Sequence, residues 1–384
     1  MEFGHHWKTI LYDGWLYKVE QEVIPENIYY HRKSESVLAK FSNNPFRILG
    51  LPVDIDSKAA YSAYEKMLKK ISLGLPVISE YDYPFLGETH RNVGVLQNAY
   101  YELQNGTSGL FWVQIKYADY IHEKETAQKR FYCSELNISK MDYDDFIISF
   151  YFIILNDPLC NKVFHWIYLI KMIGLLIRAD DSYWKMIITE RCRCNLIEPS
   201  VEQIKNYFIS TCIDTIRILI NDAILSKNIK RLEAWFQVIA NSDLDNSYFI
   251  EIVGRIKRTA DDIAEDIHCS LSQQFKKMIN DSKNESGIDV IKKEDIKEDI
   301  LNYLNSIYSV FNIIDINSQQ GKRIGEPLFK LLRIIANIYL REGYCKESKI
   351  FLIVARKCCY CDESYSLLQK DEMICDKFLC DIKK

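Results

Sequence analysis

The chain has 384 residues, of which 48% are hydrophobic, and it contains only 14 glycines and 8 prolines. This composition indicates two or three folded domains built from long regular elements, and it excludes a collagen-like or low-complexity chain. The formal net charge is −4, with 49 basic and 53 acidic residues and no basic stripe, which argues against a nucleic-acid-binding protein. We therefore expect a mostly α-helical protein that binds no nucleic acid.

The first 43 residues form an N-terminal arm in this interpretation. Within it, residues 9–19 read TILYDGWLYKV, in which Asp13 and Gly14 separate two short runs of strand-forming residues. Asp-Gly suits a two-residue turn that needs positive φ at both positions, so the sequence predicts a small β-hairpin here. An irregular arm packed on the next domain is the alternative.

Residues 44–120 form the next predicted domain, with two amphipathic helices. Asp56 or Ser57 can cap the first helix, which carries apolar residues at steps of three and four and stops at Gly74. The second helix covers residues 92–104, where an apolar stripe again follows helical spacing. We expect the two helices to pack as an antiparallel pair.

The rest of the chain is also predicted to be helical. Residues 121–280 show helical periods broken by turn signals, which indicates a central helical domain, and the polar residues 281–299 indicate a charged linker. Residues 300–384 form a C-terminal helical hairpin domain with Gly343 in its turn. Its small and apolar residues are spaced like one tetratricopeptide-type helix pair: Ala336, Tyr339, Gly343, Ser348, Leu352 and Ala355.

The twelve cysteines indicate reduced thiols in a cytoplasmic protein, since no secretory signal is recognisable. Cys358, Cys359 and Cys361 are clustered, but adjacent cysteines in a predicted helix are not the arrangement expected of a zinc knuckle. We predict no metal and no cofactor. The most apolar region, from Phe146 to Ile177, is interrupted by polar and charged residues and lacks the run of about 18 apolar residues that a membrane span requires. It is predicted to be core, so no membrane association is expected.

No catalytic constellation is recognisable. Seven histidines offer candidate bases, but none lies in a nucleophile motif, and no glycine-rich phosphate loop is present. The paired carboxylates are neighbours in sequence and point in different directions on a helix. His165, between Phe164 and Trp166, is predicted to be a core residue. The chain is therefore predicted not to be an enzyme; a pocket of converging polar groups around His165 or His122 would argue otherwise.

Residues 44–120 resemble the J-domain of DnaJ-type co-chaperones, in particular bacterial J-domain-like proteins with long helical C-terminal regions. In that family a short helix ends in Leu-Gly, and two long antiparallel helices follow. The resemblance rests on the order and spacing of eight residues: Phe46, Leu49, Gly50, Tyr64, Leu68, Ala99, Tyr100 and Leu103. It covers under a quarter of the chain.

The loop between the two long helices departs from the family pattern. J-domains that stimulate a DnaK-type ATPase carry His-Pro-Asp there, whereas His90 in this chain is followed by Arg91 and Asn92. Stimulation by the usual route is therefore not expected. The resemblance still implies docking of a DnaK-type partner on a basic helix face, for which the candidate residues are Lys58, Lys66, Lys69 and Lys70. The alternative is that these lysines only solvate an exposed face.

Two hypotheses for function follow. In the first, the chain is a non-catalytic co-chaperone-like adaptor, whose J-like domain docks a DnaK-type or related partner while the helical remainder binds a client or a second protein. In the second, the chain is a scaffold or regulatory subunit that keeps the J-like fold as structure and has no chaperone partner. The lysines of the first long helix distinguish the two, because only the first hypothesis requires them.

Overall fold

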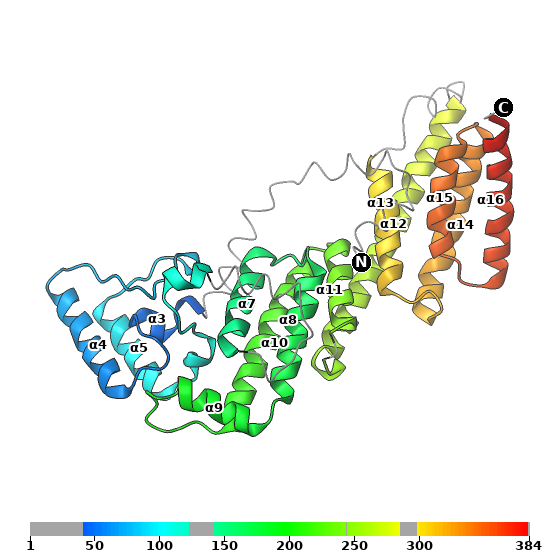
Figure 1. The fold of residues 1–384 in the computed structure, drawn as a ribbon. Helices are drawn as coiled ribbons and strands as arrows, with labels where there is room; N and C mark the ends of the chain where they lie inside the picture. The colour runs from blue at the N-terminus through cyan, green and yellow to red at the C-terminus, as the bar shows by residue number, and fades with distance from the viewer. Residues whose placement is uncertain (1–40, 123–141, 243, 285–297, 383–384) are drawn as a thin grey trace. The chain divides into compact units, whose positions relative to one another are not determined.

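The computed structural model describes residues 41–122, 142–242, 244–284 and 298–382 (Figure 1). Within these ranges the regular structure is entirely helical and contains no strand, so the prediction of a mostly α-helical protein is confirmed for this part of the chain. The β-hairpin predicted at residues 9–19 lies outside the described residues, as do residues 285–297 of the predicted linker.

Contacts divide the chain into two compact units. We call residues 41–220 and 237–249 the amino-terminal unit, and residues 221–236 and 250–382 the carboxy-terminal unit. The division falls within α10, Val201–Leu225, and within α11, Ile229–Ala240. The domain boundaries at residues 120, 280 and 300 remain predictions.

The amino-terminal unit begins with short and long helices whose starts are explained by capping side chains. Asn44 accepts a hydrogen bond from the Phe46 N–H, Asp56 from Ala59 at 2.8 Å, and Asn92 from Val95 at 2.9 Å. The predicted helix starts at Asp56 and near Asn92 are therefore confirmed. The elements in this part are α3 Pro45–Ile48, α4 Ser57–Ser72, η2 Pro84–Leu86, α5 Val93–Asn105 and η3 Ser108–Phe111.

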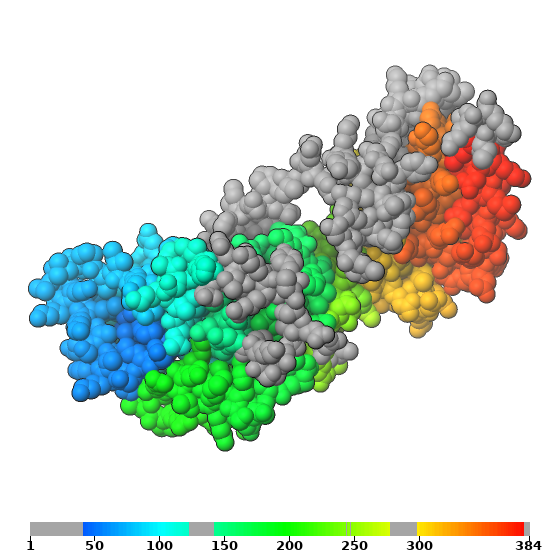
Figure 2. Space-filling model, in the orientation of Figure 1, coloured from blue at the N-terminus to red at the C-terminus, as the bar shows by residue number. Residues whose placement is uncertain are grey.

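The middle of the chain continues with helices separated by the turn signals of the sequence. Asp142 and Asp180 cap the helices that follow them, each accepting a hydrogen bond from a first-turn N–H. The elements are α7 Tyr143–Asn156, α8 Val163–Arg178, α9 Asp181–Arg191, α10, α11 and η5 Asn246–Tyr248. In Figure 2 the blue and cyan atoms of the first helices meet the green atoms of these helices without a gap.

Aromatic side chains form much of the core of the amino-terminal unit. Phe208 of α10 lies 5.4 Å from the ring of Phe146, 5.3 Å from that of Trp184 and 6.0 Å from that of Phe111, and all four side chains are buried. The apolar region from Phe146 to Ile177 forms α7 and α8, which pack against each other. Of the helices in the described ranges, none has both the length and the apolar character to cross a bilayer.

The carboxy-terminal unit is built from long helices. Gly343 has a φ of +87° and turns the chain between α14 and α15, which pack closely because Ala336, Ser348 and Ala355 are small and buried. A helical hairpin therefore exists where the sequence predicted one, while its relation to tetratricopeptide repeats remains a prediction. The elements are α12 Ile250–Asn284, α13 Glu298–Ile313, α14 Gln319–Arg341, α15 Cys345–Lys357 and α16 Asp362–Ile382.

Candidate functional site

The four candidate lysines all lie exposed on α4. Ala60 and Tyr64 are the buried residues of this helix and face the α4–α5 contact. At 100° per residue, Lys66, Lys69 and Lys70 project away from that buried stripe, as does Lys58 in the first turn of the helix. The lysine face, as we call Lys58, Lys66, Lys69 and Lys70, is thus a solvent-facing basic surface.

The residues that carried the family resemblance meet in the contact between α3, α4 and α5. Tyr64 of α4 and Tyr100 of α5 stack with ring centroids 4.7 Å apart and an interplanar angle of 12°. Gly50 has a φ of +60°, a conformation that glycine adopts without strain. Buried residues of the set are Phe46, Leu49, Tyr64, Ala99 and Leu103, while Leu68 and Tyr100 are half-buried.

The loop from Leu73 to Asn92 joins α4 to α5 and carries exposed apolar side chains beside the lysine face. Gly74, with a φ of +67°, ends α4, and the Leu75 N–H donates to the Lys70 carbonyl at 2.9 Å. Leu73 is 63% exposed, Leu75 52% and Ile78 81%. Three exposed apolar side chains within six residues of the chain, shortly after two lysines, make this segment a candidate interaction surface.

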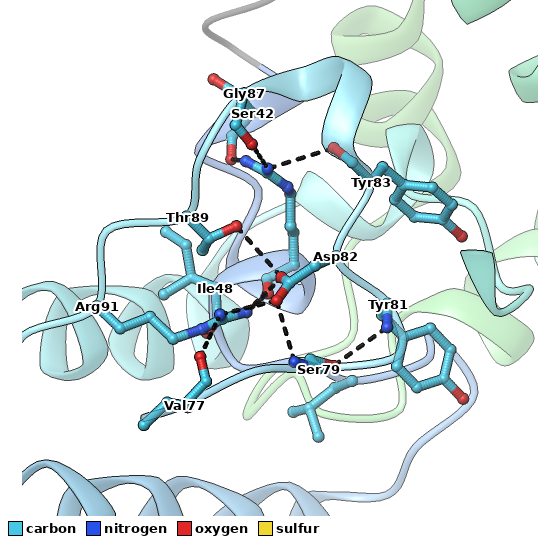
Figure 3. Close-up of polar contacts among 12 residues, drawn as sticks. Ser42, Ile48, Val77, Ser79, Tyr81, Asp82, Tyr83, Gly87, Thr89 and Arg91 are labelled. Carbon is cyan, nitrogen blue, oxygen red and sulfur yellow. Dashed lines mark hydrogen bonds and ion pairs between the residues drawn. The ribbon is translucent and has the colours of Figure 1, made fainter. Parts of the chain in front are cut away.

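Arg91 holds this loop in place and was not singled out from the sequence. Its side chain is 3% exposed and uses all five N–H donors: Nε to Ile48, Nη1 to Val77, Nη2 to Arg47, and both Nη atoms to Asp82 (Figure 3). The Asp82 contacts are 2.6 and 3.0 Å long. We call Arg91 and Asp82 the loop clamp. A partly buried bidentate pair of this kind fixes geometry strongly.

Arg47 ties the other end of the loop to α3. Its guanidinium, also buried, donates to the carbonyls of Ser42 at 2.8 Å, of Tyr83 at 3.4 Å and of Gly87 (Figure 3). The signal in the sequence was a single arginine inside the apolar stretch of residues 44–53. A charge in such a stretch is buried only with hydrogen-bonding partners, which here are backbone carbonyls.

The Asp82 carboxylate makes the clamp sensitive to pH. Burial alone would raise the pKa of Asp82, but hydrogen bonds from Arg91 and the Ser79 N–H, together with the charge of Arg91, outweigh it and hold the pKa below its usual value. Because the folded pKa is depressed, the stabilisation is complete above the unfolded pKa, about 4, and is lost as the pH falls through the folded pKa.

We therefore expect Asp82→Asn to destabilise the protein at about pH 6 and to matter progressively less toward about pH 3, because the protonated carboxyl no longer pairs with Arg91 as an anion. Urea unfolding midpoints of the two proteins, measured across this range, check the result. A midpoint difference that stayed constant with pH would contradict the role given to the Asp82 charge.

A third buried arginine joins the segment that follows α5 to the central helices. Arg191 of α9 donates to the carbonyls of Gly109 at 3.2 Å and Trp112 at 2.7 Å, and it pairs with Asp144 of α7. The segment after α9 adds contacts, since the Asn195 side chain donates to the Gly106 carbonyl at 2.9 Å. The α4–α5 pair and the segment after it are thus built into the amino-terminal unit.

Four of the histidines considered as catalytic candidates lie within the described ranges: His90, His122, His165 and His268. His165 is buried next to the Phe152 ring, and burial lowers its pKa, which fits its prediction as a core residue. His122 and His90 are exposed. Within the described ranges, no three His, Cys, Asp or Glu side chains gather in a way that could hold a metal ion.

A scan against protein-family models finds no match for this chain, and comparisons with curated proteins and with solved structures find none either. The resemblance of residues 44–120 to J-domains therefore remains an interpretation of the sequence. Function must be inferred from the geometry around α4 and its loop.

Proposed function

We propose that this chain is a non-catalytic co-chaperone-like adaptor. Its α4–α5 pair docks a DnaK-type or related partner through the lysine face, and the remaining helices bind a client or a second protein. The observation that carries the proposal is the gathering of four exposed lysines on one solvent-facing surface of α4, directly before a clamped loop with exposed apolar residues.

The charge of this surface defines the kind of partner it fits. Lys66, Lys69 and Lys70 lie within the last two turns of α4, where Glu65 is the one acidic residue between Ser57 and Ser72. A surface of this sign attracts an acidic partner, chiefly by raising the encounter rate, and the attraction weakens with salt.

The adaptor is proposed to dock without accelerating ATP hydrolysis. ATPase-stimulating J-domains carry His-Pro-Asp in the loop between the two long helices. In this chain the corresponding loop has His90 followed by Arg91, and the Arg91 side chain is bound to Asp82 in the loop clamp. No side chain in this loop reproduces that motif. Addition of the chain is therefore expected to leave the turnover of the partner unchanged.

A scaffold role without a chaperone partner is the second candidate, and one observation favours it. The α4–α5 pair is tied to the segment after α9 by hydrogen bonds that include Ser57 Oγ to the Arg193 carbonyl at 3.2 Å and Asn195 to Gly106. A module fixed in this way can serve as a structural part of a larger helical surface.

Reversal of the lysine charges separates the two candidates. We expect Lys66→Glu/Lys69→Glu/Lys70→Glu to abolish capture of a DnaK-type chaperone from the native cell extract, read by mass spectrometry, because an acidic partner surface would then be repelled. Lys185→Glu/Lys322→Glu/Lys346→Glu is the control, since these lysines are exposed on other helices and the net charge changes equally.

Circular dichroism establishes that both triple variants remain folded. Capture of the chaperone by the unaltered chain and by both triple variants alike would argue against docking on the lysine face. Capture of an unrelated protein, equally by all three forms, would favour the scaffold role.

A further inference from the structure

Ile78 is held out into solvent by the loop clamp. It is 81% exposed, yet the residues on both sides of it are anchored: the Val77 carbonyl accepts from Arg91 at 3.0 Å, and the Ser79 N–H donates to Asp82 at 3.0 Å (Figure 3). A large aliphatic side chain in this position loses the stabilisation that burial would give it. The clamp thus presents an apolar side chain that contributes nothing to the core.

Two further apolar side chains accompany Ile78. Leu73 and Leu75 are more than half exposed, and the turn that carries them is fixed by hydrogen bonds from Gly74 to the Ile71 carbonyl and from Leu75 to the Lys70 carbonyl. We call Leu73, Leu75 and Ile78 the apolar tip. A preorganised tip loses little conformational freedom when a partner covers it, which favours binding.

The charges of the residues that border the apolar tip indicate what kind of surface it can bind. The residues from Ile71 to Ser79 carry no charge, and Lys69 and Lys70 directly precede them. The nearest acidic residue after the tip, Glu80, is paired with Lys116 at 2.9 Å. The tip is therefore bordered by unneutralised positive charge on the α4 side, and its complement is an apolar depression with carboxylates along one edge.

We infer that the apolar tip is the second half of the partner-docking surface: Ile78, with Leu75 beside it, enters an apolar pocket on a protein partner whose carboxylate rim faces Lys69 and Lys70. This inference rests on the proposed function and adds the chemistry of the partner surface. It separates two contributions to affinity, one electrostatic and screened by salt, the other apolar and retained when salt is high.

The test uses a purified DnaK-type chaperone and measures dissociation constants at about 0.1 M and about 1 M salt. Leu75→Ser/Ile78→Ser is expected to weaken binding at least about tenfold at both salt concentrations. The lysine triple reversal is expected to weaken binding at low salt and to differ little from the unaltered chain at high salt. Ile197→Ser is the matched control, because Ile197 is 84% exposed but lies after α9.

Three outcomes would overturn the inference. Equal affinity of the Leu75→Ser/Ile78→Ser variant and the unaltered chain would remove the apolar tip from the docking surface while leaving lysine docking intact. Absence of chaperone binding by the unaltered chain at low salt would overturn both proposals. Binding to phosphatidylserine vesicles that depends on the same residues, without chaperone binding, would assign the tip to a lipid surface.

Discussion

Replacement of Arg91 by alanine is expected to destabilise the amino-terminal unit by about 3–5 kcal/mol, the largest effect of any single substitution in the loop clamp. The change removes the Arg91 donors from three carbonyls and from the Asp82 carboxylate, which keeps the Ser79 N–H and the Thr89 hydroxyl but loses its only cationic partner in the loop clamp. A partly buried charge without its partner costs more than the pair itself contributes. Urea unfolding measures the free energy, and hydrogen exchange of residues 73–92 locates the change.

Arg193→Ala is the matched control for that experiment. Arg193 is exposed, and its side chain donates only to the backbone carbonyls of Thr189 and Asp54, at 3.3 and 3.2 Å. Its loss is expected to change the free energy of unfolding by no more than about 1 kcal/mol. Equal effects of the two substitutions would contradict the role of Arg91 as the residue that fixes the loop.

Gly50→Ala is expected to lower the free energy of unfolding by roughly 2–4 kcal/mol, because backbone strain and a steric clash combine. The residue has a φ of +60°, where a Cβ is strained, and that Cβ would lie 2.5 Å from Ser79 Oγ and 2.7 Å from Ser79 Cβ. Ser79 cannot easily yield, since its N–H is bound by Asp82 and its Oγ accepts from the Tyr81 N–H. The measurement is again the free energy of unfolding.

Gly74→Ala separates the two costs of the Gly50 substitution. Gly74 has a similar φ of +67°, but an added Cβ would meet nothing within 4 Å. Its replacement is expected to cost only about 1–2 kcal/mol from backbone strain. Adding Ser79→Gly to Gly50→Ala should recover part of the loss by removing the steric clash. Equal destabilisation by Gly50→Ala and Gly74→Ala would show that the clash with Ser79 contributes nothing to the free energy of unfolding.

The sequence predicted the helices of the α4–α5 pair well because their determinants are local. Asp56 and Asn92 are capping residues, Gly74 supplies the positive φ at the end of α4, and apolar spacing identifies Tyr64 and Leu96 as buried. Each of these signals depends on residues a few positions away in the chain.

The loop clamp could not be predicted in the same way. Arg91 satisfies carbonyls of residues 47 and 48, more than forty positions earlier, and nothing in its neighbours indicates those partners. The exposure of Ile78 follows from the clamp, since the apolar residues of the sequence LPVI would otherwise be expected to turn inward. The structure of this loop therefore depends on side-chain hydrogen bonds between residues far apart in the sequence, which the periodicity of apolar residues cannot predict.

The clamp also bears on the proposal that the α4–α5 pair docks a partner without activating it. Arg91 lies in the loop where an activating J-domain carries its His-Pro-Asp, and here its guanidinium is directed into the protein, toward Asp82 and three carbonyls. Between Leu73 and Ser79 the same loop carries exposed leucine and isoleucine and no ionisable group. The surface is thus suited to holding a partner.

The most direct test of the central claim is the dissociation constant between the purified chain and a DnaK-type chaperone at low salt, compared with that of Lys66→Glu/Lys69→Glu/Lys70→Glu. The lysine face predicts measurable binding by the unaltered chain and an affinity at least about tenfold weaker for the variant, a difference that shrinks as salt screens the charges. Equal affinities for the two proteins, with both folded, would contradict docking through α4.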